Sequence, residues 1–156
     1  FIRVESDEVT YNLHIMLRFD MERALIAGDL NPKDLPGAWN ERMKKDQGLI
    51  VTEDRLGCLQ DIHWSMGAVG YFATYSLGNI YAAQLWEAMG KAIPDRESQV
   101  SRGEFGSILS WLRENVHAHG RRYSPEDLCE RATGERLQSD ALMRHLEAKV
   151  AAVYGV

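Results

Sequence analysis

The stretch AVGYFATYSLGNIYAAQLWEAM, residues 68–89, is apolar on nearly every face. It holds no Lys or Arg, and its one acidic residue, Glu87, comes near its end. A helix without a polar side is normally buried on all sides, so this stretch predicts the central helix of the fold. Gly70 and Gly78 inside it are expected to mark a close approach of another backbone or of a ligand.

Helical periodicity continues on both sides of this stretch. Ser6 is the expected N-cap of a long amphipathic helix that Gly28 ends, and Ser124 with Pro125 begins another helix, which Gly134 ends. The predicted helices run over 6–28, 31–48, 68–89, 103–120, 124–134 and from 139 onward. The fold class is all-α, a helical bundle. Since 156 residues with 45% apolar side chains bury one sizeable core, a single domain over 1–156 is expected.

Composition excludes several classes of partner. The formal charge of −5 gives no electrostatic reason to expect a nucleic acid or an anionic membrane surface. No run approaches the ~20 apolar residues of a membrane span, and no secretory signal opens the chain. Cys58 and Cys129 lie far apart without metal-binding spacing, which favours reduced thiols. The sequence predicts a soluble, cytoplasmic protein.

The run GCLQDIHW, residues 57–64, concentrates polar side chains beside a large aromatic. If it forms helical turns, Gln60, His63 and Trp64 share one face, and Asp61 points elsewhere except toward Trp64. Two phenols, Tyr71 and Tyr75, follow one turn apart. Polar groups that converge on an apolar wall are typical of small-molecule sites.

A packing role explains the same residues. Gln60, Asp61 and His63 can cap helix ends and bond one another while the tyrosines fill the core. The residues alone leave both interpretations open. Metal-ligand motifs such as HExxH are absent from the sequence, and His117 and His119, two residues apart, would point to opposite sides of a helix.

Two motifs carry a resemblance to a known family. IRVESD at 2–7 resembles I/V-R-x-x-A/S-D, and GCLQDIHW at 57–64 resembles G-x-x-Q-D-x-H-W, both of the Taq carboxypeptidase-type thermostable carboxypeptidases. These HExxH metallopeptidases are all-helical with a deep groove, and they are cytosolic homodimers. They use zinc or cobalt to remove single residues from the C-termini of peptide substrates. The resemblance extends over essentially the entire chain.

The resemblance also implies what this chain lacks. In the family, the HExxH helix and the third ligand precede the I-R-x-x-S-D motif, so the chain resembles the C-terminal, substrate-groove part of the enzyme without its metal-binding part. No zinc ligand is expected here, and the 156-residue chain alone is expected to be inactive. The alternative is a stand-alone helical module for binding or oligomerisation, which has kept the scaffold without the chemistry.

The resemblance assigns substrate contacts to both motifs. Arg3 is expected to hold the terminal carboxylate of the peptide, because a guanidinium can donate two parallel hydrogen bonds to it. Asp7 lies four residues on and could hold that guanidinium in place. Gln60 and Asp61 are expected to orient His63 or the peptide backbone.

The same resemblance assigns the catalytic groups. His63, Tyr71 and Tyr75 resemble the His and Tyr donors that related peptidases place opposite the metal, where they stabilise the oxyanion of the transition state. Trp64 is expected to back this substrate surface. Which of the two phenols faces the scissile carbonyl stays open.

Overall fold

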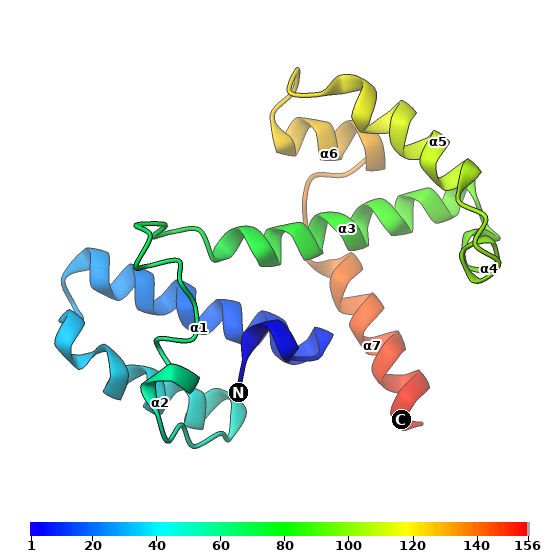
Figure 1. The fold of residues 1–156 in the computed structure, drawn as a ribbon. Coiled ribbons are helices and arrows are strands. Elements are labelled where there is room, and N and C mark those ends of the chain that lie inside the picture. Colours follow the sequence, from blue (N-terminus) through cyan, green and yellow to red (C-terminus); the bar gives the residue numbers. More distant parts are fainter. Residues whose placement is uncertain (156) are drawn as a thin grey trace. The chain divides into compact units, whose positions relative to one another are not determined.

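The computed structural model describes residues 1–155, whose regular elements are all helices (Figure 1). The α-helices are α1 (Glu8–Ala27), α2 (Leu35–Gln47), α3 (Ala73–Ala92), α4 (Arg96–Ser101), α5 (Gly106–Asn115), α6 (Pro125–Thr133) and α7 (Asp140–Tyr154). Single 3-10 turns are η1 (Arg3–Glu5), η2 (Pro32–Asp34), η3 (Asp54–Leu56) and η4 (His117–His119). The all-α prediction is confirmed.

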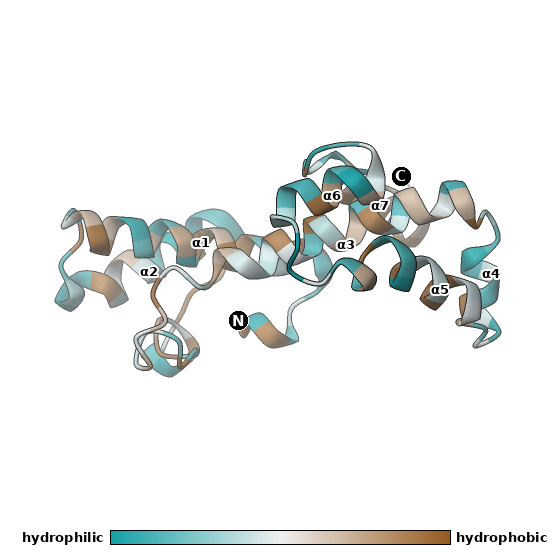
Figure 2. Ribbon diagram, turned by 90° about the horizontal axis from the view of Figure 1, so that it is seen from above, coloured by the Kyte–Doolittle hydropathy of each residue, from teal (hydrophilic) through white to brown (hydrophobic). Residues whose placement is uncertain are grey.

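Local signals in the sequence set most helix ends. Helix α1 ends at Gly28, which adopts the left-handed conformation with φ 81°, as a glycine at a helix C-terminus often does. Its N-cap is Asp7, not Ser6, because the Asp7 carboxylate accepts from the backbone N–H groups of Val9 and Thr10. Hydrophobic and hydrophilic segments alternate along α1, α2 and α6 (Figure 2), as amphipathic helices require.

The chain divides into two compact units, Phe1–Leu77 and Gly78–Val156. In the first unit, α1 and α2 lie side by side (Figure 1). Their facing side chains and the segment that follows α2 form its core, which consists of Leu17, Met21, Trp39, Met43, Val51 and Cys58. A single domain over 1–156 stays a prediction.

Helix α3 departs from the expected central helix. It begins at Ala73 rather than near 68, and only Gln84 and Met89 are buried along it, whereas Leu77 is 44% exposed. A Cβ atom added at Gly70 or Gly78 would meet nothing within 4 Å, so the expected close approach of another backbone is wrong for both within residues 1–155, and the approach of a ligand stays a prediction. An apolar composition predicts which side chains favour burial, but it does not identify the segment that covers them.

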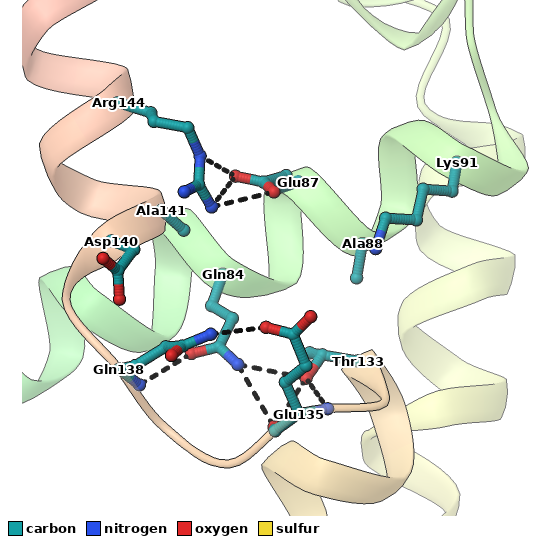
Figure 3. A pocket seen from close by; sticks show the side chains of 10 residues that line it. All are labelled: Gln84, Glu87, Ala88, Lys91, Thr133, Glu135, Gln138, Asp140, Ala141 and Arg144. Atoms are coloured by element: carbon teal, nitrogen blue, oxygen red, sulfur yellow. Dashed lines mark hydrogen bonds and ion pairs between the residues drawn. The ribbon is translucent and has the colours of Figure 1, made fainter.

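The second unit is organised by Gln84, whose side chain is 5% exposed. Its amide nitrogen donates to the Thr133 hydroxyl and to two backbone carbonyls, at 3.0 to 3.2 Å, and its oxygen accepts from the backbone of Gln138 (Figure 3). On the next turn of α3, Glu87 pairs with Arg144 of α7 through three hydrogen bonds at 2.9 to 3.1 Å. These contacts fasten the 133–138 connection and α7 to the C-terminal half of α3.

Candidate active site

Asp61 lies at the centre of the polar cluster in the first unit. Its Oδ1 accepts from Arg3 Nη2 at 2.8 Å, and its Oδ2 accepts from Arg18 Nε at 2.7 Å. Arg18 Nη2 also lies 2.7 Å from Oδ2. Both arginines are buried, at 5% and 0% exposure. One carboxylate therefore pairs with two buried guanidinium groups, Arg3 near the start of the chain and Arg18 on α1.

Burial and neighbouring charges have opposite effects on the pKa values of this cluster. Burial would raise the pKa of Asp61, but the hydrogen bonds and positive charges of Arg3 and Arg18 lower it below its ordinary value. Burial lowers the pKa of Arg18 to about 10 against the attraction of Asp61. For the less enclosed Arg3, the contacts with Asp61 outweigh burial, so its pKa is raised. Asp61 is thus ionised at neutral pH, and its charge holds the two arginines.

Arg3 is engaged on every side of its guanidinium. Nε and Nη2 donate to Asp61, and Nη1 donates to the Tyr11 hydroxyl at 2.8 Å. The expectation that Asp7 holds Arg3 is wrong, since the carboxylate that Arg3 contacts is Asp61 and the Asp7 carboxylate caps α1. Capping lowers the pKa of Asp7, chiefly through the hydrogen bond from the Thr10 hydroxyl.

Gln60 fastens the start of the chain to this cluster. Its Oε1 accepts from the Arg3 backbone N–H at 2.9 Å, and its Nε2 donates to the carbonyls of Phe1 and Leu56. The motifs at 2–7 and 57–64 are therefore joined by Gln60 as well as by the Arg3–Asp61 ion pair.

His63 and Tyr75 form a hydrogen-bonded pair. His63 Nε2 lies 2.9 Å from the Tyr75 hydroxyl, and the His63 ring stacks on Phe72 with 4.3 Å between centroids. Its Nδ1 faces Asp61 Oδ1 at 3.9 Å. The His63 side chain keeps 15% exposure, so an external group can still reach it. The pair is thus oriented by packing and remains accessible.

Tyr71 lies beside this pair on the segment that leads into α3. Its ring centroid is 5.7 Å from that of His63 and 5.5 Å from that of Tyr75, and the residue is 50% exposed. The three residues expected to be catalytic are therefore brought together. Tyr71 is the more exposed phenol, and Tyr75 is the one bonded to His63.

Trp64 points into the core rather than toward a groove. Its ring packs edge-to-face against Trp39, at 6.1 Å between centroids, and against Phe72, at 5.8 Å. Its indole N–H donates to Glu22 Oε1 at 2.9 Å. The expected substrate contact of Trp64 stays a prediction, and the geometry gives this residue a packing role.

The segment 57–64 consists of turns after η3 rather than helix, so its side chains do not share the predicted face. Gln60 reaches toward Arg3, His63 lies on Phe72, and Trp64 enters the core. Asp61, which helical geometry would direct elsewhere, is instead the centre of the cluster. The turn places four neighbouring side chains in four different environments, which a regular helix cannot do.

Sequence reasoning missed two important residues of the site, Arg18 and Glu22. With His14 they form a polar stripe along α1 at intervals of four residues, and all three are buried. Polar side chains that recur at helical spacing between the buried Leu17 and Met21 are a signal that could have identified the stripe, because buried polar groups need partners.

His14 makes the stability of the first unit depend on pH. Burial, and then the charge of Arg18, lower its pKa from 6.5 to about 4. Below pH 6.5 the unfolded chain binds the proton more readily than the folded chain does, so this contribution to stability is complete above 6.5 and is lost between 6.5 and 4. We expect the unfolding free energy to fall by about 3 kcal/mol across that window.

Urea denaturation at pH 7, 5.5 and 4.5 measures this dependence. His14→Gln keeps a polar side chain but cannot titrate, so its stability should change less over the same range. Equal pH dependence in both proteins would contradict the assignment.

Within residues 1–155, no group of three or more His, Cys, Asp or Glu side chains is arranged to hold a metal ion. The roles proposed for these residues involve no metal ligation. None of the helices in the same range has the length and apolarity to span a membrane.

Comparison with known proteins agrees with the two motifs. Residues 1–150 match the family model described as Carboxypeptidase Taq (M32) metallopeptidase. Thermostable carboxypeptidase 1 of Thermus thermophilus is 46% identical over 154 residues, which cover 99% of this chain and 30% of that protein. Carboxypeptidase 1 of Bacillus subtilis is 43% identical over 154 residues, which cover 99% of this chain and 31% of that protein.

Solved structures of carboxypeptidases are similar to this chain as well. The M32 carboxypeptidase from Deinococcus radiodurans R1 superposes with a TM-score of 0.95 at 42% identity, over 99% of this chain and 31% of that one. Trypanosoma cruzi metallocarboxypeptidase 1 superposes with a TM-score of 0.90 at 41% identity, over 94% of this chain and 31% of that one. The chain thus spans about 30% of the length of the relatives it matches. The chain belongs to the carboxypeptidase Taq (M32) metallopeptidase family.

Proposed function

We propose that this chain is the C-terminal, substrate-facing part of a metallocarboxypeptidase that removes single amino acids from the C-termini of peptides. Family membership and the similarity to proteins named as carboxypeptidases support this activity. The structural observation that supports it most is the His63–Tyr75 pair, which is hydrogen-bonded at 2.9 Å and partly accessible. The nucleophile and the metal belong to the remainder of the enzyme.

The pair serves to stabilise the oxyanion that develops when the last peptide bond is attacked. In the tautomer with the proton on Nε2, His63 donates to the Tyr75 hydroxyl oxygen, which leaves the Tyr75 O–H to donate to the oxyanion. Tyr71, half exposed beside them, is the second phenol within reach of a bound peptide. Donors that are already oriented cost no reorganisation when the charge appears, which is why they stabilise the transition state more than water does.

The geometry favours a positioning role for Arg3. Binding of the peptide carboxylate by Arg3 stays a prediction, and it would require this 5% exposed guanidinium to be shared with Asp61 and Tyr11. As found, Arg3 and Arg18 fix the two oxygens of Asp61, and Asp61 faces the Nδ1 side of His63. Gln60 supports this arrangement through the backbone of Arg3.

Further properties are proposed for the full-length enzyme on the family resemblance. These are zinc or cobalt as the metal, a cytoplasmic location and a homodimer.

Hydrolysis of defined peptides by the full-length enzyme tests the proposal. With added zinc or cobalt, a peptide with a free C-terminus should lose one residue after another by mass spectrometry, while its C-terminally amidated form should react far more slowly. Residues 1–156 alone should show no activity. A full-length protein that binds the metal but leaves both peptides intact would favour the non-catalytic module instead.

A further inference from the structure

Glu22 is a buried carboxyl group that the proposed reaction does not use. It lies on α1 at 3% exposure, and no ion pair described within residues 1–155 involves it. Its Oε1 accepts two hydrogen bonds, from the Trp64 indole at 2.9 Å and from the Gly70 backbone N–H at 2.8 Å. Its Oε2 is buried and has no hydrogen-bond partner among the described residues. Desolvating a carboxyl group for two neutral donors is costly, so this arrangement calls for a function.

We propose that Glu22 is a positioning residue that sets the geometry of the oxyanion donors. The two groups that it holds are the immediate chain neighbours of those donors, since Trp64 follows His63 and Gly70 precedes Tyr71. A single oxygen atom therefore fixes both ends of the 65–69 loop, and with them the spacing between His63 and the phenols. This inference rests on the proposed function of the His63–Tyr75 pair.

The first part of the loop closes on itself through backbone hydrogen bonds, from Gly67 N to Trp64 O at 3.0 Å and from Ala68 N to His63 O at 2.9 Å, whereas the Gly70 N–H donates to Glu22. Ser65, Met66, Gly67 and Val69 are exposed, so few packing contacts restrict them. Gly70 adopts a φ of 84° just before α3, a conformation that L side chains rarely take. Without an acceptor for its N–H, the Gly70 backbone is free to rotate and to move Tyr71 away from His63. Glu22 Oε1 is the acceptor that holds this N–H, at 2.8 Å.

The other side of Trp64 is fixed by packing. Its ring meets Trp39 and Phe72 edge-on, and Phe72 in turn lies under the His63 ring. Glu22 thus acts on His63 through a chain of contacts and does not touch the peptide. Loss of Glu22 should lower the rate of the chemical step while leaving substrate affinity intact.

Kinetics of full-length variants on a free-C-terminus peptide test the role. Glu22→Ala should lower kcat about 10- to 100-fold with KM changed less than about threefold, the range typical of a lost supporting contact. Glu22→Gln keeps an acceptor oxygen in the same place and should retain most of kcat. Trp64→Phe keeps the ring but removes one of the two donors, so its loss should be intermediate. Glu41→Gln, exposed on α2, is the matched control for carboxylate removal.

A double-mutant cycle separates this inference from the function on which it rests. In a His63→Ala background, Glu22→Ala should cost less than about threefold in kcat, because the imidazole through which Glu22 acts on the Tyr75 donor is already gone. The same fold loss in both backgrounds, or a Glu22→Gln protein as impaired as Glu22→Ala, would overturn the positioning role. If His63→Ala alone leaves kcat unchanged, the proposed function fails instead. Should Glu22→Ala not fold, Trp64→Phe with and without His63→Ala gives the same comparison.

Discussion

Asp61→Asn should destabilise the protein by about 3 to 5 kcal/mol, because it leaves two buried guanidinium groups without their counter-charge. Arg3 and Arg18 are 5% and 0% exposed, and the structure describes no other carboxylate in contact with either. The asparagine oxygen can accept hydrogen bonds but cannot neutralise the charges. For a chain of this size the melting temperature should fall by roughly 10 °C or more.

Urea denaturation of the 156-residue chain and of the full-length enzyme measures the loss. Glu104→Gln is the control, since it breaks the exposed Arg102–Glu104 pair at 2.7 Å and should leave the melting temperature unchanged. If uncompensated charge is the cause, Arg18→Met combined with Asp61→Asn should recover part of the stability that Asp61→Asn loses. An Asp61→Asn protein as stable as wild type would show that the cluster contributes nothing.

The positions of helix ends could be predicted from the sequence because they depend on the residues at those ends. The burial of whole helices could not be predicted in this way. Gly28, Gly48 and Gly134 end helices because they adopt positive φ, which is a property of the residue itself. The exposure of Leu77 on α3 depends instead on which other segments pack there, and no pattern within 68–89 contains that information. Periodicity therefore located the helices more reliably than it located the core.

In the candidate site, too, some residues could be identified from the sequence and others could not. The motif at 57–64 contains Asp61 and Trp64, so the sequence could identify them, but their partners Arg18 and Glu22 lie 43 and 42 residues away on α1. The turn at 57–64 was also unpredictable from residue types, since Gln60, Asp61 and His63 each take a separate direction there. That turn makes Asp61 the link between the two motifs, because its carboxylate holds Arg3 on one side and faces His63 on the other.

His63→Ala in the full-length enzyme should lower kcat by about 100- to 1,000-fold, which is the usual effect of removing one oxyanion donor. The reason is that Tyr75 loses the partner that orients its hydroxyl, at 2.9 Å from His63 Nε2. Tyr75→Phe removes the other half of the same hydrogen bond and should cause a comparable loss. Because the two residues act as one donor unit, the double variant should be little worse than either single variant.

A purely structural role for His63 predicts a different result. His63 packs on Phe72 and is mostly buried, so its removal could cost about 1 to 3 kcal/mol of stability, with activity falling only as the protein unfolds. Steady-state kinetics well below the melting temperature separates the two roles, with His145→Ala on α7 as the control. Near-normal kcat together with a lowered melting temperature would reject the catalytic role of His63. A kcat loss that also appears in Tyr75→Phe, without loss of stability, would instead assign the transition-state contact to this pair.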